Sequence, residues 1–114
     1  MAKDDLNVIM FKILVYLYDC TKSGEKVKQS NFNAGNNYFA KGLKQEYINS
    51  ICLMLEENNY TKGFSATTAW GGDVIMTSYD AKITIEGFEY LKENKLMKKV
   101  YNFLKETKGW IPSF

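Results

Sequence analysis

A segment with strand character, residues 60–79, separates two stretches of this chain whose apolar residues recur at helical spacing. It reads YTKGFSATTAWGGDVIMTSY, with Thr, Phe, Ile and Val enriched on both sides of Gly71 and Gly72. β-Branched and aromatic residues favour strands, and paired glycines favour the tight turn between two antiparallel strands. We therefore expect a β-hairpin that turns near these glycines, with helices arranged before and after it.

Two helices are predicted before the hairpin. In residues 4–21 the apolar residues fall at intervals of three and four, which places them on one face of a helix. The same spacing returns from Lys44 and fails near Asn58, so a second helix is expected there. Residues 27–42 are rich in Asn and Gly, and we expect a loop with one short helix around residues 38–41.

The chain changes abruptly from strand to helix at Thr84. Residues 81–94 read AKITIEGFEYLKEN, so the β-branched run ends on Thr84 and a helical pattern begins at the next residue. A threonine hydroxyl can accept a hydrogen bond from a first-turn amide that has no partner within the helix. Thr84 is therefore predicted to cap the start of a helix.

The two helices after Thr84 are expected to bury different surfaces. In the first, Ile85, Phe88 and Leu91 lie three apart and are expected to close over the hairpin. Gly87 lets the same helix come close to neighbouring backbone. A final helix is predicted over residues 96–108, with one apolar face. Its outer lysines, for which a solvated face is favoured over contact with phosphates, are Lys95, Lys98, Lys99 and Lys105.

The predicted order is helix, short element, helix, hairpin, helix, helix. A helical pair followed by a β-hairpin is the layout of a winged helix, in which the second long helix reads the major groove and the hairpin is the wing. A length of 114 residues with one Pro and no low-complexity tract favours one domain. We expect a single α+β domain over residues 1–114, a winged helix (helix-turn-helix plus β-hairpin wing) with an extra C-terminal helix.

The composition argues against catalysis. Without His the chain has no Ser-His-Asp or Cys-His arrangement and no imidazole ligand for a metal. Cys20 and Cys52 lie in apolar helical patterns and are expected to be buried thiols in a reducing compartment. Glu56 and Glu57 are adjacent at a helix end, which favours solvated surface over acid–base chemistry. We expect a protein that is not an enzyme and has no cofactor, metal or small-molecule substrate.

No apolar run approaches the roughly 18 residues needed to cross a bilayer. The start of the chain, MAKDDLN, is acidic where a signal peptide would be basic. These two features predict a cytoplasmic protein with no membrane partner.

Candidates for DNA binding gather at the start of the second helix. Lys44, Gln45 and Asn49 are predicted on its outward face, where they can reach base edges or phosphates. Lys41 before this helix and Lys62 beside the wing are expected to add phosphate contacts. Against DNA binding, the chain has no Arg for the bidentate contact with guanine, and its pI is near 8.4.

Two tryptophans indicate a second possible function. Trp70 at the wing tip is expected either to fold back on the core, which is the favoured interpretation, or to project toward a partner or groove. Trp110, with Ile111 and Phe114, is expected either to dock on the first helix or to pair two subunits in a homodimer. The alternative function is therefore a non-catalytic protein–protein interaction module on a winged-helix scaffold.

Three motifs carry a family resemblance. LEENNYTKG, ITIEGFEYLKEN and MKKVYNFLKETKGWIP resemble the YjcQ-like family of small winged-helix proteins from Gram-positive bacteria and their prophages. The resemblance extends over residues 43–112 and also suits the first helix. It implies a winged-helix fold, an intracellular and phage-related origin, and a DNA-binding role as a transcriptional regulator. That role follows from fold analogy.

Overall fold

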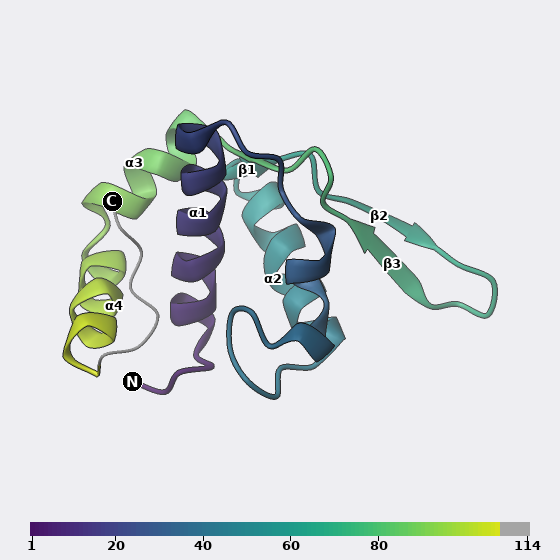
Figure 1. The fold of residues 1–114 in the computed structure, drawn as a ribbon, viewed down its shortest axis with the longest axis horizontal. Coiled ribbons are helices and arrows are strands. Elements are labelled where there is room, and N and C mark those ends of the chain that lie inside the picture. The colour runs from purple at the N-terminus through teal and green to yellow at the C-terminus, as the bar shows by residue number, and fades with distance from the viewer. Residues whose placement is uncertain (108–114) are drawn as a thin grey trace.

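The computed structural model describes residues 1–107 and has an α+β architecture, with packed helices and two small antiparallel sheets (Figure 1). The helices are α1 (Leu6–Ser23), α2 (Gln45–Glu57), α3 (Ile85–Glu93) and α4 (Lys95–Glu106). The strands are β1 (Thr61–Lys62), β2 (Ser65–Thr68), β3 (Val74–Thr77) and β4 (Lys82–Ile83). α1 lies between α2 and the α3–α4 pair, and the β2–β3 hairpin extends outward beside α2. The α+β class is confirmed, and the arrangement is compatible with a winged helix that has α4 as its extra C-terminal helix.

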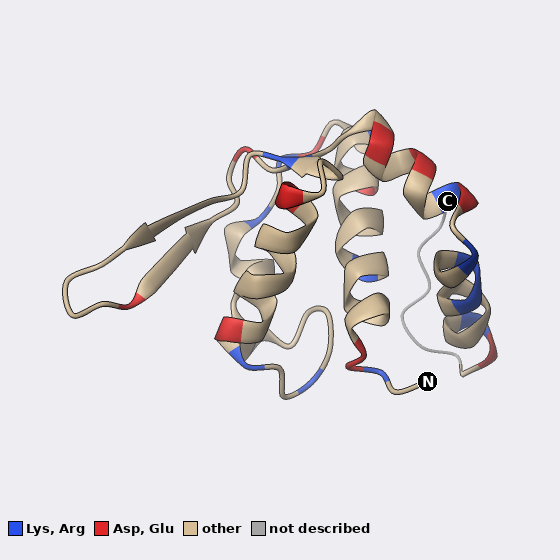
Figure 2. Ribbon diagram, turned by 180° about the vertical axis from the view of Figure 1, so that it is seen from behind, with Lys and Arg blue, Asp and Glu red and all other residues tan. Residues whose placement is uncertain are grey.

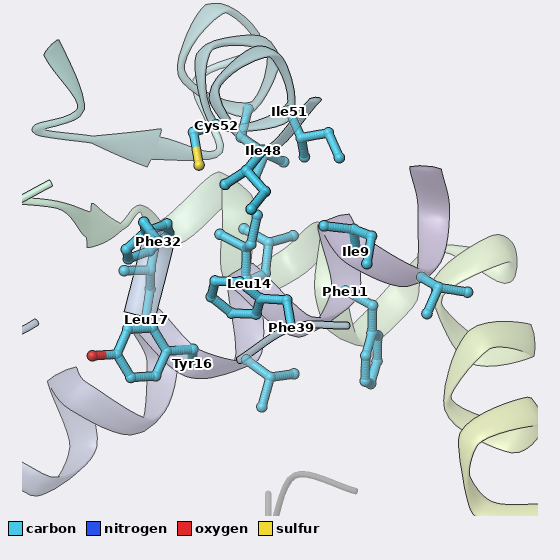
Figure 3. Packing of buried hydrophobic residues seen from close by; sticks show 14 of the residues in the cluster. Ile9, Phe11, Leu14, Tyr16, Leu17, Phe32, Phe39, Ile48, Ile51 and Cys52 are labelled. Atoms are coloured by element: carbon cyan, nitrogen blue, oxygen red, sulfur yellow. The ribbon is translucent and has the colours of Figure 1, made fainter. Parts of the chain in front are cut away.

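α1 is the centre of the core because apolar residues cover most of its surface. Its fully buried apolar side chains are Val8, Ile9, Phe11, Ile13, Leu14, Val15 and Leu17. Ile48 and Ile51 of α2 join this cluster on one side (Figure 3), and Leu104 of α4 joins it on the other. Gly24 ends the helix in the left-handed conformation, with φ of 75°. A helix that is apolar on most faces must be covered by neighbours, and α2, α3 and α4 provide this cover.

The short helix predicted over residues 38–41 is wrong. Residues 24–44, here called the connector between α1 and α2, instead contain two 3₁₀ turns, η1 (Gln29–Phe32) and η2 (Ala34–Asn36). Asn37 then adopts a left-handed φ of 52°, and its side-chain oxygen accepts a hydrogen bond from the amide of Gly42 at 3.2 Å. This bond closes residues 37–42 into a loop. A helix does not form there because Asn side chains compete for the backbone groups that a helix would pair.

Two aromatic residues anchor this connector to α1. Phe32 and Phe39 are buried, and their ring centroids lie 5.9 and 6.1 Å from that of Tyr16. The Tyr16 hydroxyl also accepts a hydrogen bond from the amide of Lys28 at 2.8 Å. The connector is therefore held by side chains rather than by regular secondary structure.

Lys12 is a charged residue inside the core. Its side chain is 5% exposed, and Nζ donates a hydrogen bond to the carbonyl oxygen of Phe39 at 2.6 Å. Burial lowers the pKa of Lys12, and the positive charge of Lys3 lowers this pKa further. Lys12 thus ties the connector to α1 while carrying a desolvation penalty in its charged form.

We expect this penalty to appear as a pH dependence of stability. Between the lowered pKa of folded Lys12 and its ordinary value of 10.5, the unfolded chain binds more protons, so the free energy of unfolding rises with pH. Urea unfolding of the parent and of Lys12→Met, from neutral pH to pH 10.5, isolates this contribution because all other titrating groups are shared. The stability of the parent relative to the variant should increase across this range. A constant difference would contradict the prediction.

The joint at Thr84 is built as the sequence predicts. Its Oγ1 accepts a hydrogen bond from the amide of Gly87 at 2.9 Å and donates one to the carbonyl oxygen of Asn59 at 2.6 Å. A Cβ on Gly87 would lie 2.0 Å from the carbonyl oxygen of Tyr60, so the predicted close backbone approach is also confirmed. The preceding strand β4 pairs with β1 instead of lengthening the hairpin.

The position predicted for Ile85 is wrong. This side chain is 76% exposed, because α3 packs on α1 and α4 rather than over the hairpin. Phe88 instead contacts α1, with its ring centroid 5.1 Å from that of Tyr18, and Leu91 is buried. Ile85 is the first residue of α3 and lies in solvent.

α4 is amphipathic, as predicted. It buries Met97, Val100 and Leu104 and exposes Lys95, Lys98, Lys99 and Lys105. Figure 2 shows this basic face in blue, on the side of the molecule opposite the wing. Within residues 1–107, no helix combines the length and the apolar character required to cross a lipid bilayer.

Candidate nucleic-acid interface

A cleft of about 540 Å³ lies between α2 and the wing, where a winged helix would meet DNA. α2 contributes one wall, formed by Gln45, Glu46, Asn49, Ser50 and Leu53. The wing contributes the other, formed by Gly72, Asp73 and Val74. The predicted turn at Gly71 and Gly72 is confirmed, and β2 pairs with β3 across it. The cleft therefore brings two segments about 20 residues apart in the sequence to one surface.

The outward orientation predicted for Gln45 is wrong. Its side-chain oxygen accepts a hydrogen bond from the amide of Ala34 at 2.8 Å, and Nε2 donates to the carbonyl oxygen of Phe32 at 2.9 Å. Nε2 also donates to Oδ1 of Asn49 at 3.0 Å. Gln45 therefore fixes the connector against the start of α2, because the turns there leave backbone groups that no helix satisfies. Asn49 is half-buried beside it and keeps Nδ2 for another acceptor.

The structure separates the predicted lysines into two groups. Lys41 and Lys44 are exposed just before α2, and Lys62 is exposed on β1, which follows the other end of this helix. α2 has 13 residues, so its ends lie about 20 Å apart. Lys41 and Lys44 therefore share one end of α2, and Lys62 belongs to the other.

The charge around the cleft is acidic. Glu46 and Asp73 line opposite walls, and the sequence has no Lys between Lys62 and Lys82. Figure 2 shows β2 and β3 without basic residues, whereas blue segments lie beside α2 and along α4. Phosphates would be repelled by these carboxylates, so an approaching duplex is favoured only at Lys41 and Lys44, which are exposed just before α2.

Glu56 has a structural role that the sequence interpretation missed. Its carboxylate accepts hydrogen bonds from Oγ1 of Thr61 at 3.0 Å and from the amides of Gly63 and Phe64 at 3.2 and 3.4 Å. The prediction of solvated surface is wrong for Glu56, although Glu57 is exposed. Glu56 joins the end of α2 to the base of the wing. No feature of the sequence separates the two glutamates, because the difference arises only where the chain turns back beyond α2.

Trp70 projects from the wing tip. Its side chain is 102% exposed, so the favoured prediction that it folds back on the core is wrong. The amide of Ala69 donates to the carbonyl oxygen of Asp73 at 2.7 Å, which closes a short loop beyond the reach of the core. Trp110, the other predicted partner contact, lies outside the described residues.

The two cysteines are free and buried, as predicted. Burial raises the pKa of both Cys20 and Cys52, which disfavours the thiolate form needed of a nucleophile. In the part of the chain that the structure describes, no three Cys, Asp or Glu side chains gather where they would hold a metal ion.

Comparison with known proteins identifies a family. The family model described as YjcQ protein matches residues 11–110. The match contains α1 from residue 11 onward, the connector, α2, the wing and the two C-terminal helices. Neither the curated proteins nor the solved structures gave a match. The chain belongs to the YjcQ protein family.

Proposed function

We propose that this chain is a non-catalytic DNA-binding protein, in the role of a phage-related transcriptional regulator, and that it holds DNA by the start of α2. The observation that carries the proposal is the position of α2, whose exposed N-terminal end stands beside a projecting wing. Lys41 and Lys44 are exposed at this end, where phosphate contacts would fix a helix in the major groove.

Base recognition through this helix is expected to be weak. Oδ1 of Asn49 already accepts a hydrogen bond from Gln45, which turns this oxygen toward Gln45 and leaves the N–H groups of Nδ2 for other partners. Bidentate pairing with adenine needs both the oxygen and the nitrogen of the amide. A donor alone can bond to any base pair that offers an acceptor in the major groove, so it distinguishes little between them. Gln45 is itself held by the connector. Binding should therefore depend on phosphate contacts and discriminate little between sequences.

Two substitutions test this proposal. Lys44→Ala should weaken binding to every duplex and reduce the log–log salt slope by about 0.9, because one phosphate contact is lost. Asn49→Ala should remove the small preference between sequences and leave the salt slope unchanged. Fluorescence anisotropy of labelled duplexes of several sequences, titrated at several salt concentrations, measures both effects.

Lys105→Ala is the matched control, since Lys105 is also an exposed helical lysine but lies on α4. It should bind DNA like the parent. If Lys44→Ala and Asn49→Ala also bind like the parent, α2 does not contact DNA. A parent that binds no duplex at low salt would overturn the proposal altogether.

A second candidate function is the protein–protein interaction module. It is favoured by the wing, whose tip carries the fully exposed Trp70 and whose strand β3 carries Val74 and Ile75, both about half exposed. Exposed aromatic and aliphatic side chains on one projecting hairpin are typical of contact surfaces.

A further inference from the structure

The two strands of the wing present different backbone groups to their outer edges. In the β2–β3 ladder Ser65 is opposite Thr77 and Thr67 is opposite Ile75. The bond from the amide of Ala69 to the carbonyl oxygen of Asp73 continues this series, so the odd-numbered residues of β2 point their backbone groups toward β3. Ala66 and Thr68 consequently point theirs to the outer edge of β2. Met76 does the same on β3.

The outer edge of β3 is already occupied. The side-chain Nε2 of Gln29 donates to the carbonyl oxygen of Met76 at 3.2 Å. Its Oε1 accepts hydrogen bonds from the amide and the hydroxyl of Ser78 at 2.6 and 2.7 Å. The side-chain amide group of Gln29 thus takes the place that a backbone peptide group of a neighbouring strand would occupy. Val74, farther along the same strand, lines the cleft with α2.

The outer edge of β2 has no such cover. All four residues of β2 are exposed, and within residues 1–107 no side chain or loop is hydrogen-bonded to the backbone of Ala66 or Thr68. The segment from Gly63 to Gly72 contains neither a charged residue nor Pro. Natural proteins usually protect an edge strand with charges, Pro, a bulge or a covering element, because unpaired backbone groups attract another strand.

We propose that β2 pairs with β2 of a second copy of this chain, antiparallel about a two-fold axis at Thr67. This inference rests on the second proposed function, the interaction module. In this register Ala66 of one copy faces Thr68 of the other, so the outward groups of both residues are satisfied reciprocally. Thr67 faces Thr67 across the axis, a favourable cross-strand pair.

Charge and shape favour a second copy as the occupant. β2 and β3 carry no charged residue, so two wings meet without like-charge repulsion. The cleft with α2 is lined by Val74 of β3 and by no residue of β2, and the hairpin extends outward, which leaves room for a second hairpin alongside β2 (Figure 1). The same register places Trp70 of one copy opposite Phe64 of the other, so the exposed indole reaches the base of the second wing.

The dimer should be weak and concentration-dependent. Each copy contributes a four-residue strand and one tryptophan, less than the roughly 1,200 Å² of total buried surface typical of stable interfaces. Sedimentation velocity over a wide concentration range should therefore show a reversible monomer–dimer equilibrium. In amide hydrogen exchange, Ala66 and Thr68 should gain protection as concentration rises, while Ala69, bonded within its own wing, should change little.

A matched pair of substitutions tests the edge itself. Ala66→Pro removes the outward N–H and should weaken dimerisation at least tenfold, while leaving the β2–β3 ladder intact. Ala66→Val keeps that N–H and should dimerise like the parent. Thermal unfolding of both variants at low concentration establishes that the monomers are folded. If Ala66→Pro is unfolded, the concentration-dependent protection of Ala66 and Thr68 in the parent decides the question instead.

Two results would overturn this inference in different ways. If the parent is monomeric at all concentrations, and amide hydrogen exchange at Ala66 and Thr68 does not change with concentration, β2 is unpaired and the proposed dimer is wrong. A dimer that survives Ala66→Pro but is lost in Trp70→Ala overturns strand pairing, yet the interaction module stands with the wing tip as its contact.

Discussion

Gly63→Ala should lower the free energy of unfolding by about 3 kcal/mol or more, because two separate costs coincide at this position. The φ of Gly63 is +96°, a conformation that residues with a Cβ rarely adopt. The added Cβ would also lie 2.0 Å from the carbonyl oxygen of Asp80. That oxygen belongs to the backbone at the base of the wing, so it cannot rotate away as a flexible side chain would. Urea unfolding of the parent and the variant measures the loss.

Gly71→Ala is the matched control for this substitution. Gly71 also has a positive φ, of 92°, but a Cβ there would meet nothing within 4 Å. It should therefore show only the conformational cost, about 1–2 kcal/mol. The difference between the two variants isolates the contact between Gly63 and Asp80. Equal losses would mean that the wing base is open enough to accept a methyl group.

Phe32→Ala should lower the free energy of unfolding by about 3–5 kcal/mol. The side chain is fully buried, and its ring centroid lies 5.9 Å from that of Tyr16, 5.2 Å from that of Phe39 and 5.4 Å from that of Phe64. These three rings belong to α1, the connector and the base of the wing. Removing the Phe32 side chain therefore leaves a cavity where these three segments meet. The cost is large because the surrounding residues relax only partly into such a cavity.

Urea unfolding again measures the effect of Phe32→Ala. Tyr79→Ala removes a large aromatic ring that is 69% exposed, and it should change stability by no more than about 0.5 kcal/mol. Comparable losses in the two variants would contradict the central position given to Phe32.

The elements with local signals could be predicted from the sequence. The hairpin at Gly71, the cap at Thr84 and the close approach at Gly87 each follow from a residue whose backbone or hydroxyl has few alternatives. The helical faces of α1 and α2 follow from apolar spacing, because burial requires it. These features fix the order of the elements, which is compatible with a winged helix.

The features that depend on contacts between distant segments could not be predicted. Gln45 is turned inward by the backbone of Phe32 and Ala34, and nothing in its own helix indicates those partners. Glu56 differs from Glu57 only because the wing base folds back on it. The connector lacks periodicity altogether, since aromatic anchors rather than backbone ladders hold it. The predicted DNA contacts were affected most, because Gln45 is one of them.

The hydrogen bonds of Gln29 also bear on the order in which the chain folds. They join residues 47 and 49 positions apart, whereas Ser65 and Thr77 of the wing are 12 apart. Closing a long loop loses chain entropy before any contact rewards it, and a hairpin of this size forms within microseconds. The hairpin should therefore form before Gln29 reaches it. Until the connector docks, a newly made chain exposes both edges of its wing, and that interval is when strand exchange with a neighbouring chain competes with folding.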